Sequence, residues 1–439
     1  MKRFGLQELV TWKSSPNRKP LIMRGARQVG KTWLMKKFGE QEYENIAYIN
    51  FESDTSLKGL FQSDYDTRRI LLAMQIASGQ PVEAGKTLMI WDEIQEAPGA
   101  ITSLKYFSEN APEYHIVSAG SLLGVALNGS TSFPVGKVDF MDLHPLNFPE
   151  FLEALGDSSL VDLLNSRDWP LIRTFKNKFI ERLRQYYFIG GMPEAVQAFS
   201  LRTDFNEVRK IQQNILVAYE QDFSKHAPHE IVPRIRMLWH SIPAQLAKEN
   251  KKFTYGLIKR GARAKDFEIA MAWLQDCGLI HRVHNVSKPA MPLKAYENLS
   301  AFKLFLFDVG LLSALSQLDV KTLITGNLIF EEFKGALTEQ YVLQQLVADK
   351  SEAICYWAAE NMRSEIDFIL QRGGRIIPIE VKAAENLHAK SLRVFCEKFK
   401  PALAIRTSMS DYREETWMIN WPLYAIGGMG GINGQFLPG

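Results

Sequence analysis

The sequence contains few cysteines and has no long apolar run. The cysteines lack the paired spacing that zinc sites and redox CxxC motifs need, so we expect reduced, buried thiols at Cys277, Cys355 and Cys396. The apolar stretch at residues 302–315 is interrupted by Lys303 and Asp308, and no segment is long enough to cross a bilayer. The opening residues, MKRFGLQELV, lack the apolar core of a signal peptide. These absences predict a cytoplasmic protein without a membrane partner.

An excess of charge of one sign is also missing, because the formal net charge is only +3. No field of the whole molecule therefore attracts it to nucleic acid or to an anionic membrane, and any basic surface must be local. The length of 439 residues exceeds what one hydrophobic core usually organises, in a chain of globular composition. Two or three domains are therefore expected.

Four short apolar runs near the amino terminus predict strands of a buried parallel sheet. They are rich in β-branched or aromatic residues, and the stretches between them, such as residues 66–78, are suited to crossover helices. The runs occupy residues 20–23, 46–51, 87–91 and 114–118. This pattern predicts an α/β nucleotide-binding domain of the P-loop type at residues 1–158.

Amphipathic stretches then replace the strand signals and predict a helical lid or connector at residues 159–245. The amphipathic stretches are residues 149–155, 171–187 and 206–223. In the next part, residues 246–328, a basic stretch precedes a predicted helix at 266–276, a turn and the strand-like LIHRV. That order is typical of a winged helix.

The last large segment, residues 329–426, returns to an α/β pattern. A helix is predicted at residues 331–348, and strands are predicted at residues 354–357, 366–370 and 376–381. The glycine-rich residues 427–439 predict a mobile tail.

The strongest motif is GARQVGKT at residues 25–32, which matches the P-loop pattern GxxxxGK[ST] between a predicted strand and helix. Backbone N–H groups of such a loop bind phosphates, Lys31 contributes charge at the β- and γ-phosphates, and the Thr32 hydroxyl is a ligand for Mg²⁺. A chance glycine-rich turn is a poor alternative. The residues predicted to bind ATP are Gly25, Ala26, Arg27, Gln28, Val29, Gly30, Lys31 and Thr32.

A second motif, TLMIWDE at residues 87–93, places two carboxylates after a predicted strand. We assign Asp92 to Mg²⁺ and Glu93 to the general base that activates water, with Lys31 as the other catalytic residue. A solvated strand end would explain an isolated Asp-Glu pair, but the P-loop upstream favours the functional interpretation.

Two further residues are candidates for contacts with the nucleotide. Ser121, or Ser118 in second place, would sense the γ-phosphate from the end of a strand, although a serine-rich turn explains the pattern equally well. Lys137 would donate a cation to the nucleotide of a neighbouring copy, although a lone surface lysine is usually only solvated.

A carboxy-terminal cluster combines Asp367 on one predicted strand with Glu380 and Lys382 on the next. Residues two apart in a strand share a side, so this pattern would present two carboxylates and an ammonium together. Such a trio, with Glu339 from the preceding helix as a further ligand, could hold a divalent metal and cleave a phosphodiester. The alternative is a solvated hairpin in which Glu380 and Lys382 form an ion pair.

Basic residues gather beside the predicted winged helix, where phosphate contacts with DNA would be wanted. A solvated face explains the same charges equally well. These residues are Lys251, Lys252, Lys259, Arg260, Arg263 and Lys265.

In these motifs the sequence resembles a large prokaryotic family of AAA-type ATPases that carry a carboxy-terminal domain of unknown function, DUF4143. The resemblance covers nearly the whole chain. It implies an AAA+ module, a winged-helix-like middle and a terminal domain similar to PD-(D/E)xK nucleases. Besides the P-loop and TLMIWDEIQ, it includes AGSLLGVAL, PVGKVDFMDLHPLNFPEFL, GGMPEA at 190–195, DVGLL at 308–312, SEIDFIL and IPIEVK.

The leading hypothesis is therefore an ATP- and Mg²⁺-dependent switch or motor that acts on DNA, in which hydrolysis rearranges the terminal domains. The second hypothesis is an ATP-controlled, metal-dependent nuclease that uses Asp367, Glu380 and Lys382. The third is a DNA- or protein-binding module that nucleotide only stabilises. A homo-oligomer is compatible with each of them.

Overall fold

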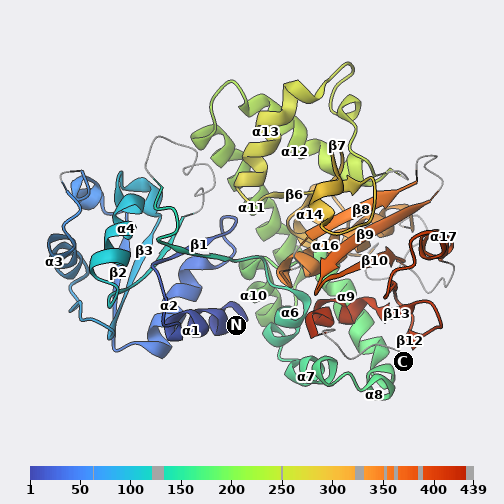
Figure 1. Cartoon of the computed structure of the whole chain (residues 1–439), viewed down its shortest axis with the longest axis horizontal. Coiled ribbons are helices and arrows are strands. Elements are labelled where there is room, and N and C mark those ends of the chain that lie inside the picture. The colour runs from blue at the N-terminus through green and yellow to red at the C-terminus, as the bar shows by residue number, and fades with distance from the viewer. Residues whose placement is uncertain are drawn as a thin grey trace. The chain divides into compact units, whose positions relative to one another are not determined.

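The computed structural model describes residues 1–62, 64–120, 133–248, 251–321, 331–350, 353–359, 364–383 and 389–431. The chain divides into two compact units, each with its own sheet (Figure 1). The amino-terminal unit comprises Lys2–Pro145 and Asp276–Leu279. The carboxy-terminal unit comprises Leu146–Gln275 and Ile280–Gly439, together with Met1.

The amino-terminal unit contains a sheet of five parallel strands in the order β2-β3-β4-β1-β5. Strands β3 and β4 are buried along their whole length, as their continuous apolar runs predict. The four predicted strands and the parallel α/β fold are confirmed. The strands are β1 (Leu21–Arg24), β2 (Asn45–Asn50), β3 (Thr87–Asp92), β4 (His115–Ala119) and β5 (Asp139–Asp142).

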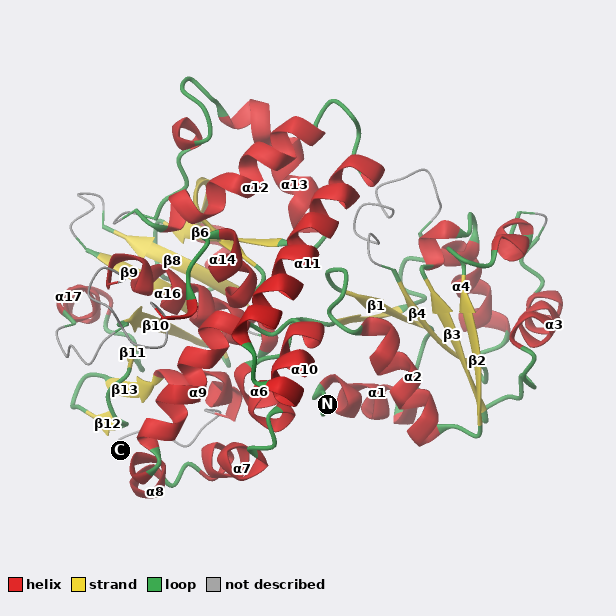
Figure 2. Ribbon diagram, turned by 180° about the vertical axis from the view of Figure 1, so that it is seen from behind, coloured by secondary structure: helices red, strands yellow, loops and turns green. Residues whose placement is uncertain are grey.

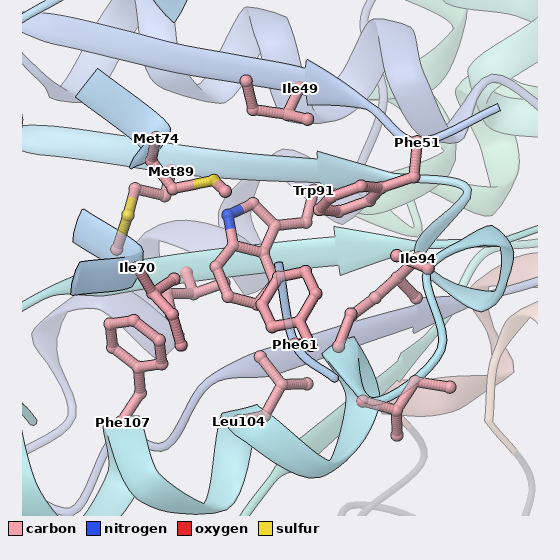
Figure 3. Packing of buried hydrophobic residues seen from close by; sticks show 14 of the residues in the cluster. Ile49, Phe51, Phe61, Ile70, Met74, Met89, Trp91, Ile94, Leu104 and Phe107 are labelled. Atoms are coloured by element: carbon pink, nitrogen blue, oxygen red, sulfur yellow. The ribbon is translucent and has the colours of Figure 1, made fainter. Parts of the chain in front are cut away.

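Helices cover both faces of this sheet. On one face α3 and α4 enclose Trp91, whose ring contacts those of Phe51, Phe61 and Phe107 at centroid distances of 5.6–6.1 Å (Figure 3). Helix α2 lies on the other face, against Leu88. The helices are α1 (Gly5–Ser14), α2 (Lys31–Glu42), α3 (Thr67–Ser78) and α4 (Ala100–Asn110), with 3-10 turns η1 (Thr55–Gly59) and η2 (Ile94–Glu96).

The carboxy-terminal unit begins with helices, in agreement with the amphipathic periodicity of its sequence. The predicted helix at residues 171–187 is two helices, because α8 ends at Thr174 and α9 begins at Lys176. The helices are α6 (Phe148–Ala154), α7 (Ser158–Ser166), α8 (Trp169–Thr174), α9 (Lys176–Ile189), α10 (Pro193–Arg202), α11 (Phe205–His226) and α12 (Val232–Leu246).

An eight-stranded mixed sheet follows, in the order β12-β13-β11-β10-β9-β8-β6-β7 (Figure 2). The antiparallel hairpin of β6 and β7 joins the later strands through the parallel pair of β6 and β8. The sheet therefore continues across the boundary that we predict between residues 328 and 329. The strands are β6 (Ile280–Val286), β7 (Glu297–Leu306), β8 (Ala353–Ala358), β9 (Glu365–Arg372), β10 (Arg375–Val381), β11 (Ile405–Ser408), β12 (Arg413–Glu414) and β13 (Ile419–Pro422).

The remaining helices accompany this sheet. The predicted helices at 266–276 and 331–348 correspond to α13 and α16, and the predicted tail begins inside the helical segment η6, with residues 432–439 outside the described part. These elements are α13 (Ala264–Asp276), α14 (Val309–Leu315), α16 (Glu331–Ala348) and α17 (Lys390–Phe399), with 3-10 segments η3 (Tyr255–Leu257), η4 (Leu293–Tyr296) and η6 (Leu423–Gly431).

Candidate nucleotide-binding site

The loop between β1 and α2 turns at two glycines with positive φ. Gly25 has a φ of +146°, and a Cβ atom there would lie 2.2 Å from the carbonyl oxygen of Leu143, so no other residue fits. Gly30, with a φ of +94°, precedes the first residue of α2. The loop is therefore followed directly by a helix amino terminus, whose free N–H groups favour anions.

Lys31 is the first residue of α2 and is only 6% exposed. Its ammonium donates hydrogen bonds to the carbonyl oxygens of Gly25 and Ala26, at 2.8 and 2.9 Å. Burial lowers the pKa of Lys31 to about 8, although Glu93 and Asp92 oppose this shift. Two hydrogen bonds thus hold Lys31 against the loop at which it is predicted to bind phosphate.

Thr32 and Asp92 lie together at the carboxyl end of the sheet. The Thr32 hydroxyl donates to Asp92 Oδ2 at 2.7 Å, and Asp92 is 4% exposed. The Tyr48 hydroxyl, from β2, donates to the same oxygen at 3.1 Å. Hydroxyl and carboxylate oxygens are the ligands that Mg²⁺ prefers, so these residues fit the predicted metal.

Glu93 follows Asp92 with a φ of +49°, an uncommon conformation for a residue other than glycine. Its Oε2 atom accepts a hydrogen bond of 2.7 Å from the side-chain amide of Gln95. The turn directs the chain away from β3 into η2, so adjacent carboxylates have different partners: Asp92 contacts Thr32, and Glu93 contacts Gln95. This separation suits the different roles that we predict for them.

Ser118 and Lys137, two further residues predicted to contact nucleotide, have partners outside the loop. The Ser118 hydroxyl is fully buried and donates to the Leu21 carbonyl at 3.0 Å, which joins β4 to β1. Ser121 lies outside the described residues, so its role stays a prediction. Lys137 forms an ion pair with Glu109 of α4 at 2.8 Å. Neither Ser118 nor Lys137 is shown beside the loop.

The four residues of the predicted nuclease-like site fall into two groups. Glu380 Oε2 accepts the N–H of Leu392 at 3.0 Å, and Glu380 Oε1 pairs with Lys382 at 2.7 Å. Asp367 and Glu339 belong to a different cluster, centred on lysine side chains. The ion pair of Glu380 and Lys382 is thus present, although Glu380 is buried rather than solvated.

Lys303 of β7 occupies the centre of that second cluster. Its ammonium lies 2.5 Å from Glu365 Oε1, 3.5 Å from Glu339 Oε2 and 3.7 Å from Asp367 Oδ1. Lys251 pairs with the other oxygen of Glu339. Burial raises the pKa of Asp367 to about 7, and Glu339 adds to this shift.

The basic stretch beside α13 is only partly available to a partner. Lys251 is committed to Glu339, and its side chain is 12% exposed. The others stand on the surface, at the start of α13 or shortly before it. The exposed members are Lys252, Lys259, Arg260, Arg263 and Lys265.

Three residues at these sites were not predicted from the sequence, namely Tyr48 at the first site and Lys303 and Glu365 at the second. Tyr48 had no signal, since an aromatic residue in a strand usually indicates packing. Lys303 did have a signal in the sequence, because a single charge inside an apolar run must find a partner when the strand is buried. Glu365 stands directly before the predicted strand of Asp367.

Comparison with known families agrees with this geometry. The AAA domain family matches residues 17–152, and the domain of unknown function DUF4143 matches residues 334–425. Between them, residues 180–322 match another domain of unknown function, DUF8612. The P-loop, its parallel sheet and the AAA match define an ATPase of the AAA type. The resemblance to AAA-type ATPases with a carboxy-terminal DUF4143 domain is likewise confirmed.

Solved structures are similar to this chain at low identity and low TM-score. The Walker-type ATPase PABY2304 of Pyrococcus abyssi is 13% identical, with 72% of this chain and 95% of that chain covered and a TM-score of 0.46. The RuvB Holliday junction branch migration motor of Thermotoga maritima is 14% identical, with 64% and 90% covered and a TM-score of 0.30. At these scores the likeness supports no statement about substrates or partners.

The search for relatives among curated proteins gave no match. Among the helices that the structure describes, none combines the length and apolar character that crossing a membrane requires.

Proposed function

We propose that the chain hydrolyses ATP with the help of Mg²⁺ and uses the reaction to drive a conformational switch that acts on DNA. The observation that carries this proposal is the 2.7 Å contact between Thr32 and Asp92, directly after a P-loop. When bound, Mg²⁺ would neutralise charge on the β- and γ-phosphates. Thr32 and Asp92 would hold it, Lys31 would bind phosphate oxygens, and Glu93 would accept the proton of the attacking water.

Replacement of the P-loop lysine tests the proposal. Lys31→Ala should reduce ATP hydrolysis to near background, because the variant loses the ammonium that is predicted to bind phosphate oxygens at the loop. Lys37→Ala, on the same helix but exposed and paired with Glu40, is the matched control and should retain activity. Phosphate release by the folded variants is the measurement, and undiminished turnover by Lys31→Ala contradicts the proposal.

Contact with DNA is proposed from the exposed charges around the start of α13. Arg260, Arg263 and Lys265 are exposed at the entrance of that helix, and the antiparallel hairpin of β6 and β7 follows it. A helix followed by a hairpin is the order of a winged helix, and Arg and Lys at this place can contact phosphates without regard to sequence. A DNA duplex is therefore the partner that we propose for this face.

The proposed DNA contact predicts that substitutions on this face weaken DNA binding more than substitutions elsewhere. Arg260→Ala combined with Arg263→Ala should weaken binding of a labelled duplex and reduce the slope of log affinity against log salt by roughly 1–2. Lys390→Ala combined with Lys400→Ala removes the same charge from exposed positions elsewhere. Fluorescence anisotropy over a salt series compares the two. Equal losses in both variants would mean that only net charge matters.

A homo-oligomer forms part of the proposal because a neighbouring copy could supply a cation to the nucleotide. Lys137 is 41% exposed in its pair with Glu109, so it can exchange that partner for a phosphate. ATP turnover per chain should then rise with protein concentration, and Lys137→Ala should remove the rise. Constant turnover per chain, together with a monomeric mass in ATP and Mg²⁺, contradicts this part.

A further inference from the structure

Lys303 joins parts of the carboxy-terminal unit that are far apart in sequence. It lies in the middle of β7, is fully buried, and contacts carboxylates of α16 and β9. Its ammonium also lies 5.1 Å from the ring centroid of Tyr356, on β8, so the lysine crosses the face of the sheet between β7 and β9. Isolated burial of an ammonium is strongly unfavourable, and the carboxylates offset that cost.

Glu339 is held by lysines at both of its oxygens. Lys303 lies near Oε2, and Lys251, which precedes an isolated bridge between residues 252 and 303, lies at Oε1. Burial by itself would raise the pKa of Glu339, but the two ammonium groups outweigh it and lower the pKa. The carboxylate is therefore ionised and compensated by the chain itself.

A nuclease-like fold implies a divalent metal at Asp367, Glu380 and Glu339, but the arrangement does not fit one. Asp367 Oδ2 accepts the N–H of Val381 at 2.8 Å, while both oxygens of Glu380 have partners of their own on Leu392 and Lys382. Within the described residues, no group of three or more His, Cys, Asp or Glu side chains could hold a metal ion.

We propose that Lys303 and Lys251 replace the divalent metal of a nuclease-like site, so that the terminal domain is a metal-free structural element rather than a metal-dependent nuclease. Two fixed ammonium groups supply the two positive charges that one divalent ion would supply. They come from the segment before the terminal domain, and therefore fasten β7 to α16 and β9. The ion pairs of this cluster then hold the three elements together, independently of the ATPase site.

Thermal unfolding of the full chain without nucleotide, with Mn²⁺ or with EDTA, tests the proposal. Every protein in this experiment, including the parent, carries Asp92→Asn. This substitution prevents Mn²⁺ at the P-loop from changing the melting temperature. The parent should unfold at the same temperature in both buffers. Lys303→Met should lower the melting temperature by roughly 5–15 °C, because it removes the buried ammonium that compensates the carboxylates of Glu339, Glu365 and Asp367. Mn²⁺ should restore part of that loss, and further Asp367→Asn substitution should abolish the restoration.

Lys382→Met is the matched control, since it removes a lysine that pairs only with Glu380 among the clusters described above. It should create no response to Mn²⁺. Where Lys303→Met does not fold, Lys251→Met takes its place, because that side chain is partly exposed.

Three outcomes would overturn the proposal. The first is an Mn²⁺-dependent rise in the melting temperature of the parent that Asp367→Asn removes. The second is a lysine variant as stable as the parent, or one that Mn²⁺ fails to restore. The third is cleavage of plasmid DNA by the otherwise unaltered chain in Mn²⁺ that Asp367→Asn abolishes.

Discussion

Asp308 Oδ2 accepts a hydrogen bond from the backbone N–H of Gly191 at 2.7 Å, across 117 positions of the sequence. The other oxygen accepts the N–H of Leu311 at 2.9 Å and so caps α14. Gln344 donates to Oδ2 at 3.1 Å. Two segments that carry the family resemblance, GGMPEA and DVGLL, therefore form one buried contact, which explains their residue types through structure rather than catalysis.

The glycines of this contact should be intolerant of side chains. A Cβ atom at Gly310 would lie 2.3 Å from the carbonyl oxygen of Ile189 and 2.5 Å from the N–H nitrogen of Gly190. Gly310→Ala should therefore lower the free energy of unfolding by about 3 kcal/mol, because backbone atoms have to move apart. Gly256→Ala is the control, since a Cβ there meets one methyl group at 4.0 Å. Urea unfolding measures both, and equal stabilities would disprove the packing argument.

The general base can be separated from the binding residues. Glu93→Gln keeps the size of the side chain and its contact with Gln95, but it cannot accept a proton. Turnover should fall by roughly 10²–10⁴-fold, with the affinity for ATP within a few-fold of the parent. Equilibrium binding of a fluorescent ATP analogue and steady-state phosphate release measure the two effects. Parallel loss of affinity and turnover would assign Glu93 to binding instead.

Four strands of the first sheet were predictable from sequence because each reads as a short apolar run, and β3 and β4 are buried along their whole length. Strand β5 was not predictable, since only Met141 of its sequence DFMD is fully buried, at 2% exposed. A strand at the edge of the sheet needs fewer apolar residues, so its run carries no signal.

The P-loop site was predictable in outline, because its chemistry requires Lys31, Thr32 and Asp92 in a recognisable order. The cluster around Lys303 was not predictable, because its members come from β7, α16 and β9, and only the folded sheet brings them together. Proximity between elements is decided by tertiary packing, which a linear pattern does not encode. The motif that suggested a metal site was therefore found, but its ionic partners were missed.

Tyr48 should tune the response to magnesium. Tyr48→Phe removes one hydrogen bond to Asp92 Oδ2 and leaves the ring, over which the Lys36 ammonium lies at 3.7 Å. A loss of about 1 kcal/mol should raise the Mg²⁺ concentration for half-maximal ATPase activity roughly fivefold, with little change in maximal turnover. Tyr65→Phe, in a ring stack with Tyr106, is the control. An unchanged magnesium profile would exclude a role for this hydroxyl.

His115 should make the amino-terminal unit sensitive to acid. The residue is 8% exposed at the start of β4, and its Nδ1 atom lies 2.7 Å from the Tyr43 hydroxyl. Burial lowers the pKa of His115 to about 4, and Arg18 and Lys13 add to the shift. An unfolded chain takes up the proton near pH 6.5, whereas the folded chain resists it until about pH 4. The stabilising contribution is therefore complete above pH 6.5 and is lost as the pH falls toward 4.

His115→Gln retains a hydrogen-bonding side chain beside Tyr43 but does not titrate. The amount by which the free energy of unfolding of the parent exceeds that of His115→Gln should fall by about 1–2 kcal/mol when the pH is lowered from 8 to 5. The reason is that only the parent gains a proton at this position on unfolding. The exposed His229 supplies the control, and His229→Gln should follow the parent at both values. Urea unfolding at pH 8 and 5 decides the matter. A constant difference between parent and His115→Gln would mean that the buried imidazole accepts its proton as readily as an exposed one does.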